Sequence, residues 1–156
     1  MKKTKTTETM TDENCAETDR KALNALYGNV TMAKHSVESL LPYVEDKTLK
    51  GMLRKQVNKY DTFISDIENV AEKNQWEVTS LKWAQMMADV SIKIKMAVNS
   101  GNTNVAKMMM QGTLNGIIDL YVMMRHWDNI DKKITDVAQK LLNYQEDKLD
   151  EMKLML

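Results

Sequence analysis

The fold of this chain is decided by the stretch LNALYGNVTMAKHSVESLLPYV, residues 23–44. Its apolar residues recur at alternating steps of three and four, at Leu23, Leu26, Val30, Ala33, Val37, Leu40 and Val44. Since an α-helix has about 3.6 residues per turn, this alternation places them all on one face. The pattern predicts a helix that buries this face against other helices.

The same spacing returns in several later segments, so we expect several helices around one core. The first helix should begin at Thr18 or Asp19, either of which can cap a helix, and end near Leu41 because Pro42 lacks a backbone donor. Asp46 is a good N-cap for the second helix. Further helices are expected over about 47–74, 79–99 and 103–127, and after a break at 128–131.

The four long segments predict an all-α, antiparallel four-helix bundle. The shorter segment 79–99 is suited to be an additional crossover helix between two helix hairpins. Residues 1–17 contain little apolar surface, so we expect a disordered tail followed by a single domain over 18–156. Gly112 and Gly116, one turn apart, are expected to mark a close helix crossing, with a large side chain such as Trp83 as the neighbour.

Composition limits the classes of partner. The chain has 156 residues with 22 basic and 22 acidic side chains, a formal net charge of +0, so we expect neither nucleic acid nor an anionic membrane as partner. The N-terminal stretch lacks the apolar run of a secretory signal, and the one cysteine, Cys15, suits a reducing compartment. These features predict a cytoplasmic protein.

Two segments carry a resemblance to a known family: NVAKMMMQGTLNGIID at 104–119 and LLNYQEDKLDEMK at 141–153. They are similar to uncharacterised bacterial ferritin-like bundles, which share a Gln-Gly-x-x-x-Gly-Ile-Ile-Asp segment. The resemblance covers Leu23 to Leu156. It implies a ferritin-like fold, in which two helix hairpins joined by a long crossover surround a buried site.

Ferritin-like proteins with metal use Glu-x-x-His pairs, and this chain departs from that pattern. Its two histidines, His35 and His126, follow Met32 and Met123 at the position where a glutamate would stand. We read both histidines as surface residues.

The other candidate ligand positions also lack the right chemistry. The core-facing candidates of the second helix are Gln56 and Lys59, and Lys107 stands in the fourth helix where a glutamate is expected. Glu146 and Asp147 in the last helix have no histidine beside them. We therefore expect no metal and no cofactor.

Methionine is the most visible excess, with 14 residues. Most fall at core spacing, where a flexible side chain fills gaps. Two other uses stay open: Cu(I) ligation by thioethers, and an adaptable groove for a partner helix.

Five polar residues lie on or beside the core stripes and form a possible buried polar cluster: Gln56, Tyr60, Asn115, Asp119 and Tyr144. Such groups usually satisfy one another or fix helix register. Alternatively they line an interior pocket in which Asp119 is an acid or base.

The favoured function is a non-catalytic, metal-free structural or interaction module that forms a homodimer. The alternatives are a ferritin-like metal-binding or redox protein with an unorthodox site, and a carrier of a hydrophobic ligand in a methionine-lined interior.

Overall fold

The computed structural model describes residues 4–79, 93–96, 99 and 101–156, with side chains from Asp12 onward. The described residues are helical or lie in turns and loops, and none of them forms a strand, so the all-α prediction is confirmed. The elements are α1 (Thr4–Leu40), the short 3-10 helix η1 (Leu41–Tyr43), α2 (Lys47–Lys73), α4 (Asn102–Arg125) and α5 (Lys132–Lys153).

The crossover helix predicted over 79–99 lies mostly outside the described residues, as does Trp83. Residues 93–96 and Asn99 are helical, and Ile94 is buried in the core.

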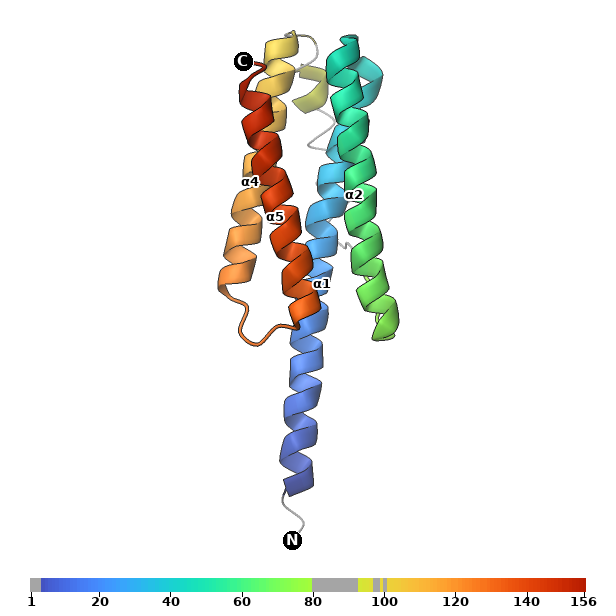
Figure 1. The fold of residues 1–156 in the computed structure, drawn as a ribbon, viewed down its shortest axis with the longest axis vertical. Coiled ribbons are helices and arrows are strands. Elements are labelled where there is room, and N and C mark those ends of the chain that lie inside the picture. The colour runs from blue at the N-terminus through green and yellow to red at the C-terminus, as the bar shows by residue number, and fades with distance from the viewer. Residues whose placement is uncertain (1–3, 80–92, 97–98, 100) are drawn as a thin grey trace.

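The long helices are arranged as two hairpins, α1 with α2 and α4 with α5 (Figure 1). Figure 1 shows α1 and α5 running in one direction and α2 and α4 in the other. The hairpins pack together through α1 on α4 and α2 on α5, so these neighbours are also antiparallel. α2 ends at one end of the bundle, and α4 begins at the other.

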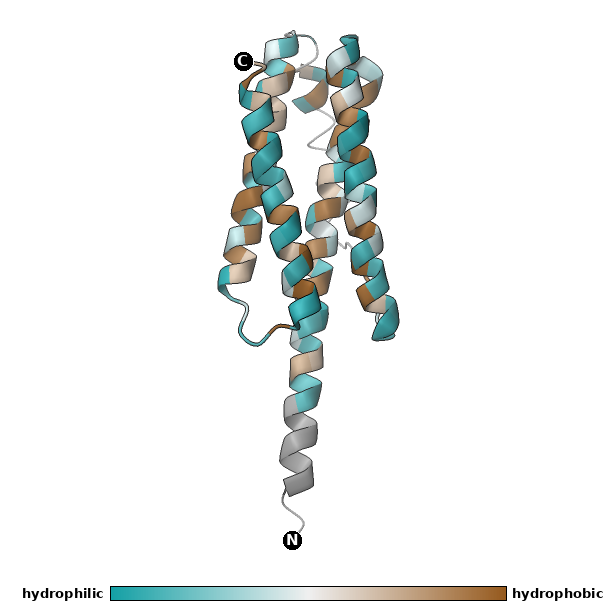
Figure 2. Ribbon diagram, viewed as in Figure 1, coloured by the Kyte–Doolittle hydropathy of each residue, from teal (hydrophilic) through white to brown (hydrophobic). Residues whose placement is uncertain are grey.

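The apolar stripes read from the sequence make the core. Along α1, Leu23, Leu26, Val30 and Leu40 are almost completely inaccessible to solvent, and Ala33 is half-buried against them. Figure 2 shows the matching pattern on the ribbon, with apolar and polar residues alternating along every helix. The heptad spacing therefore identified the buried faces correctly.

The predicted end of the first helix and start of the second are confirmed. Pro42 lies in η1, directly after α1 ends at Leu40. Asp46 is the N-cap of α2, and its Oδ1 accepts a 2.7 Å hydrogen bond from the backbone N–H of Leu49. The cap satisfies a backbone donor that the helix itself leaves without a partner.

The predicted start of the first helix is wrong. α1 begins at Thr4, and the expected caps Thr18 and Asp19 lie inside it. Figure 1 shows the N-terminal half of α1 extending beyond the other helices, and its side chains from Asp12 to Thr18 are exposed. The segment predicted as a disordered tail is thus helical from Thr4 onward.

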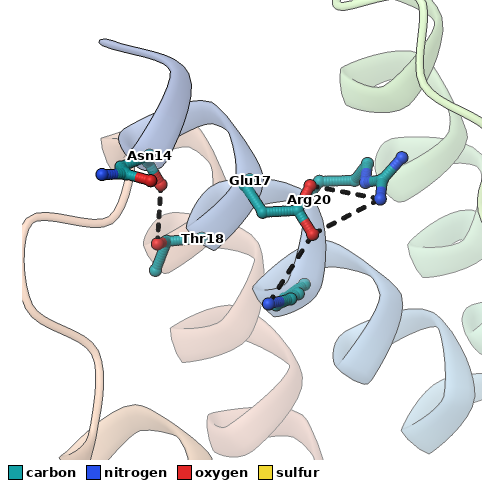
Figure 3. A network of polar contacts seen from close by, with 5 residues as sticks. Asn14, Glu17, Thr18 and Arg20 are labelled. Carbon is teal, nitrogen blue, oxygen red and sulfur yellow. Dashed lines mark hydrogen bonds and ion pairs between the residues drawn. The ribbon is translucent and has the colours of Figure 1, made fainter. Parts of the chain in front are cut away.

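Local interactions support this extension of α1 (Figure 3). Glu17 forms ion pairs with Arg20 at 3.1 Å and with Lys21 at 3.6 Å, and the Thr18 hydroxyl donates to the carbonyl of Asn14. Starting a helix is costly, whereas adding residues to an existing one is cheap. The buried part of α1 supplies the nucleus, so the polar segment before it needs no core of its own.

Candidate ligand cavity and exposed stripe

A cavity of about 530 Å³ lies between the helices of the bundle and opens to the surface beside α4. Its wall is formed by all four long helices together with Lys93. One side is apolar, with Val37, Leu40, Met109 and Met152. A volume of this size is in the range of about 300–1,000 Å³ that is typical of small-molecule sites.

The predicted polar cluster is only partly buried. Gln56 and Tyr60 are 2% and 3% exposed, whereas Asn115 and Asp119 are exposed residues of α4. These four residues line the cavity, so the structure does bring them to one place. The buried half comes from α2 and the exposed half from α4.

Tyr144, the fifth predicted residue, is half-buried and does not line the cavity. It packs against Tyr60. Its ring meets that of Tyr60 edge to face, with centroids 5.7 Å apart, and also lies 5.7 Å from that of Phe63. Burial raises the pKa of the Tyr60 phenol above its ordinary value. Burial, with the nearby Glu151 carboxylate as a second cause, raises the pKa of Tyr144 to about 12. Both phenols therefore keep their protons at neutral pH.

Two amides that the sequence analysis missed form the polar centre of the cavity wall. Gln145 is 1% exposed, and its Nε2 donates a 3.2 Å hydrogen bond to Oδ1 of Asn29. The Nδ2 of Asn29 in turn donates a 3.2 Å hydrogen bond to the carbonyl of Gly116. This chain of hydrogen bonds connects α5, α1 and α4.

A signal for Gln145 was present in the sequence. Buried residues of α5 continue the alternation of fours and threes through Ile134, Ala138, Leu141, Gln145 and Met152. A second stripe, Ile134, Val137, Leu141 and Tyr144, has equally regular spacing, and choosing it left out Gln145, the neighbour of Tyr144. Asn29 also lies at such a spacing, three residues after Leu26 and four before Ala33, but the stripe read from the sequence passed through Val30 instead.

Among the described residues, the predicted glycine crossing has a close neighbour at Gly116 and none at Gly112. A Cβ placed on Gly116 would lie 3.1 Å from Oε1 of Gln145, so the absent side chain gives room to the Gln145 amide. A Cβ on Gly112 would meet no described atom within 4 Å. The close approach at Gly116 is therefore between the backbone of α4 and the side chain of Gln145 in α5.

The methionines include four that line the cavity: Met32, Met108, Met109 and Met152. Met109 and Met152 are buried, as core filling predicts. Met32 and Met108 are only half-buried at the cavity wall.

The expected ligand positions have other roles. Lys59, predicted to face the core, is exposed and places its Nζ 5.2 Å from the centroid of the Phe63 ring. Lys107 is exposed, and Glu146 accepts a 2.7 Å hydrogen bond from the Tyr121 hydroxyl. Nδ1 of His35 lies 3.0 Å from Glu38. Within the part of the chain that the structure describes, no three His, Cys, Asp or Glu residues gather as a metal site would require.

A second feature is an apolar stripe on the outer face of α4, made of Leu114, Ile118, Tyr121 and Val122. These residues are 39%, 50%, 53% and 55% exposed. Their spacing of three and four places them on one face of the helix. We call this set the α4 stripe.

No protein-family model matches the chain, and no curated protein or solved structure is detectably similar to it. Among the described residues, no helix combines the length and the apolar character needed to cross a membrane.

Proposed function

We propose that this protein is a non-catalytic, metal-free helical bundle of the ferritin-like kind, and that it acts as an interaction module by pairing with a second copy of itself. The observation that carries the proposal is the α4 stripe. Four large apolar side chains gathered on one exposed helix face are unusual for a surface that contacts only water. The two-hairpin topology supports the ferritin-like part of the proposal.

The spacing of the stripe suits self-pairing. Leu114 lies four residues before Ile118, and Val122 lies four residues after it. In an antiparallel pair with a twofold axis at Ile118, each Ile118 faces its counterpart and each Leu114 faces Val122 of the other copy. Twofold interfaces of this type are the commonest among homo-oligomers.

Charge favours a second copy as the partner. In the same pairing, Arg125 faces Gln111, so no like charges are opposed at these positions. The formal net charge of +0 removes long-range repulsion between two copies. The Tyr121 hydroxyl donates to Glu146 of α5, which holds its ring in place at the stripe.

The test is the oligomeric state of the full chain by sedimentation velocity, from low micromolar to millimolar concentration. The wild type should be a dimer, and Ile118→Lys should be a monomer because it brings two ammonium groups together at the axis. Thr62→Lys makes the same charge change on the exposed face of α2 and should leave the dimer intact. A monomeric wild type, or a dimeric Ile118→Lys variant, would contradict the proposal.

A charge pair tests the antiparallel register. Leu114→Glu and Val122→Lys should each weaken the dimer, since each leaves a charge against an apolar side chain. The double variant should restore it, because every Glu then faces a Lys of the other copy. No restoration would mean that the two residues do not face each other.

A further inference from the structure

The cavity wall contains a hydrogen-bond acceptor that has no partner. Oε1 of Gln145 is buried and receives no hydrogen bond among the described residues. Leaving such a group unsatisfied costs more free energy than an ordinary hydrogen bond returns. Gln145 lines the cavity, so a bound molecule that reaches this acceptor would recover that cost.

The chain of hydrogen bonds determines that the free atom is an oxygen. The carbonyl of Gly116 can only accept, so Asn29 must turn its NH₂ group toward it. The Oδ1 of Asn29 then faces Gln145, which must turn its own NH₂ group toward Asn29. Exchanging O and N in either amide would oppose two acceptors or two donors.

The free acceptor, Oε1 of Gln145, therefore favours a ligand that carries a hydrogen-bond donor. A hydroxyl or an amine N–H can donate to Oε1 of Gln145, whereas a carboxylate or an ether has only acceptor atoms to offer. The charged residues of the wall are Lys93 and Asp119, which have opposite signs and are both exposed. They give no net preference for an ion.

The rest of the wall suits an apolar chain. The side chains of Met108, Met109 and Met152 line the cavity, and methionine adapts its shape to different apolar partners. Leu40 and Val37 extend this apolar surface along α1.

We propose that the cavity is a binding site for a small, uncharged amphipathic molecule. Its hydroxyl group, or an uncharged N–H such as that of an amide, donates a hydrogen bond to Oε1 of Gln145, and its apolar chain lies against the methionines of α4 and α5. This site is separate from the α4 stripe, whose residues do not line the cavity.

The experiment compares two probes with the same atoms, n-octanol and heptyl methyl ether, of which only the alcohol has a donor. NMR of the full chain with isotope-labelled methionine methyl groups reports binding directly. n-Octanol should shift the signals of Met108, Met109 and Met152, while Met52, which does not line the cavity, stays unchanged. The ether should bind about tenfold more weakly, as expected for one lost hydrogen bond.

Removing both amides tests the assignment to Gln145. In Asn29→Leu/Gln145→Met the polar pair becomes apolar with little change of volume, a replacement that stability often tolerates. The tenfold preference for the alcohol should disappear in this variant. The matched control is Asn143→Leu/Gln139→Met, which removes an exposed pair joined by the same type of hydrogen bond, at 2.8 Å. The control should keep the preference.

A variant that fills the space keeps the proposal testable if the double variant does not fold. Ala33→Phe adds a ring at the cavity wall and should abolish binding of both probes. The proposal is overturned if the lining methionines do not respond to n-octanol, or if the two probes bind equally well to the wild type. It is also overturned if Ala33→Phe leaves binding unchanged, or if the preference survives removal of both amides.

Discussion

The carboxylate of Asp19 in α1 accepts a 2.9 Å hydrogen bond from the backbone N–H of Asp131. Asp131 is the N-cap of α5, and its own carboxylate accepts a 2.7 Å hydrogen bond from the N–H of Lys133. Asp19 was expected to begin the first helix. It instead binds the N-cap residue of α5. It connects the first hairpin to the loop of the second.

Replacing Asp19 should weaken this connection. We expect Asp19→Ala to lower the free energy of unfolding by about 1 kcal/mol, since a partly exposed hydrogen bond to a charged group is lost. Asp19→Asn keeps an acceptor and should cost less. Urea denaturation measures both, with Glu17→Gln as the control for loss of an exposed carboxylate in α1. Equal stability of Asp19→Ala and wild type would show that the contact contributes nothing.

Gly116→Ala should be destabilising by about 1 kcal/mol. The helix gains roughly 1 kcal/mol in propensity, but the new methyl group lies 3.1 Å from Oε1 of Gln145 and must displace an amide that is bonded to Asn29. Losing that bond in a buried site costs about 1–3 kcal/mol. Gly51→Ala in α2 is the matched control, because its Cβ meets no described atom within 4 Å, and it should be stabilising. The midpoints of chemical denaturation of both variants and the wild type test this prediction. A higher midpoint for Gly116→Ala than for the wild type would contradict it.

Removing residues 1–17 should change thermal stability little. The side chains from Asp12 to Glu17 are exposed, and the ion pairs of Glu17 are surface pairs of small energetic value. A chain that begins at Thr18 should have a Tm within about 5 °C of the full chain, which corresponds to about 1 kcal/mol. Calorimetry measures this. A larger drop would show that the extension of α1 packs against the bundle.

Stability should fall at alkaline pH because of the buried phenols. The folded state raises the pKa of Tyr60 and Tyr144 above the ordinary value of 10.0. Between pH 10 and about 12 the unfolded chain therefore holds fewer protons than the folded one, so the free energy of unfolding decreases as pH rises. Tyr60→Phe should make this decrease shallower, while Tyr43→Phe, at an exposed site, should not. The same pH dependence in Tyr60→Phe and wild type would refute the assignment.

The purified protein should contain well below one iron, manganese or zinc ion per chain. The positions expected for ligands hold an amide at Gln56 and ammonium groups at Lys59 and Lys107, which bind hard metals poorly. Elemental analysis after growth in iron-rich medium checks this prediction. Two tightly held ions per chain would contradict it.

The bundle could be predicted from the sequence because helix formation leaves local signals. Heptad spacing identified the buried face of α1, and Asp46 and Pro42 marked the boundary between α1 and α2. The start of α1 could not be predicted from composition, because the helix is continued by short-range contacts rather than by burial.

The cavity was less predictable than the helices. Four of the five predicted polar residues line it, but only the two of α2, Gln56 and Tyr60, are buried, whereas Asn115 and Asp119 of α4 are exposed. The pairing of Asn29 with Gln145 spans 116 positions of the chain and depends on the relative rotation of α1 and α5. No local pattern determines that rotation.

The two-hairpin arrangement has a consequence for the order of folding. Each hairpin joins helices that are neighbours in the sequence, so its contacts close short loops and should form early. Docking of one hairpin on the other closes a much longer loop and should come later. The cavity takes its wall from both hairpins and therefore exists only after docking. A molecule that occupies it would hold the two halves together and slow their separation, so the occupied protein should unfold more slowly than the empty one.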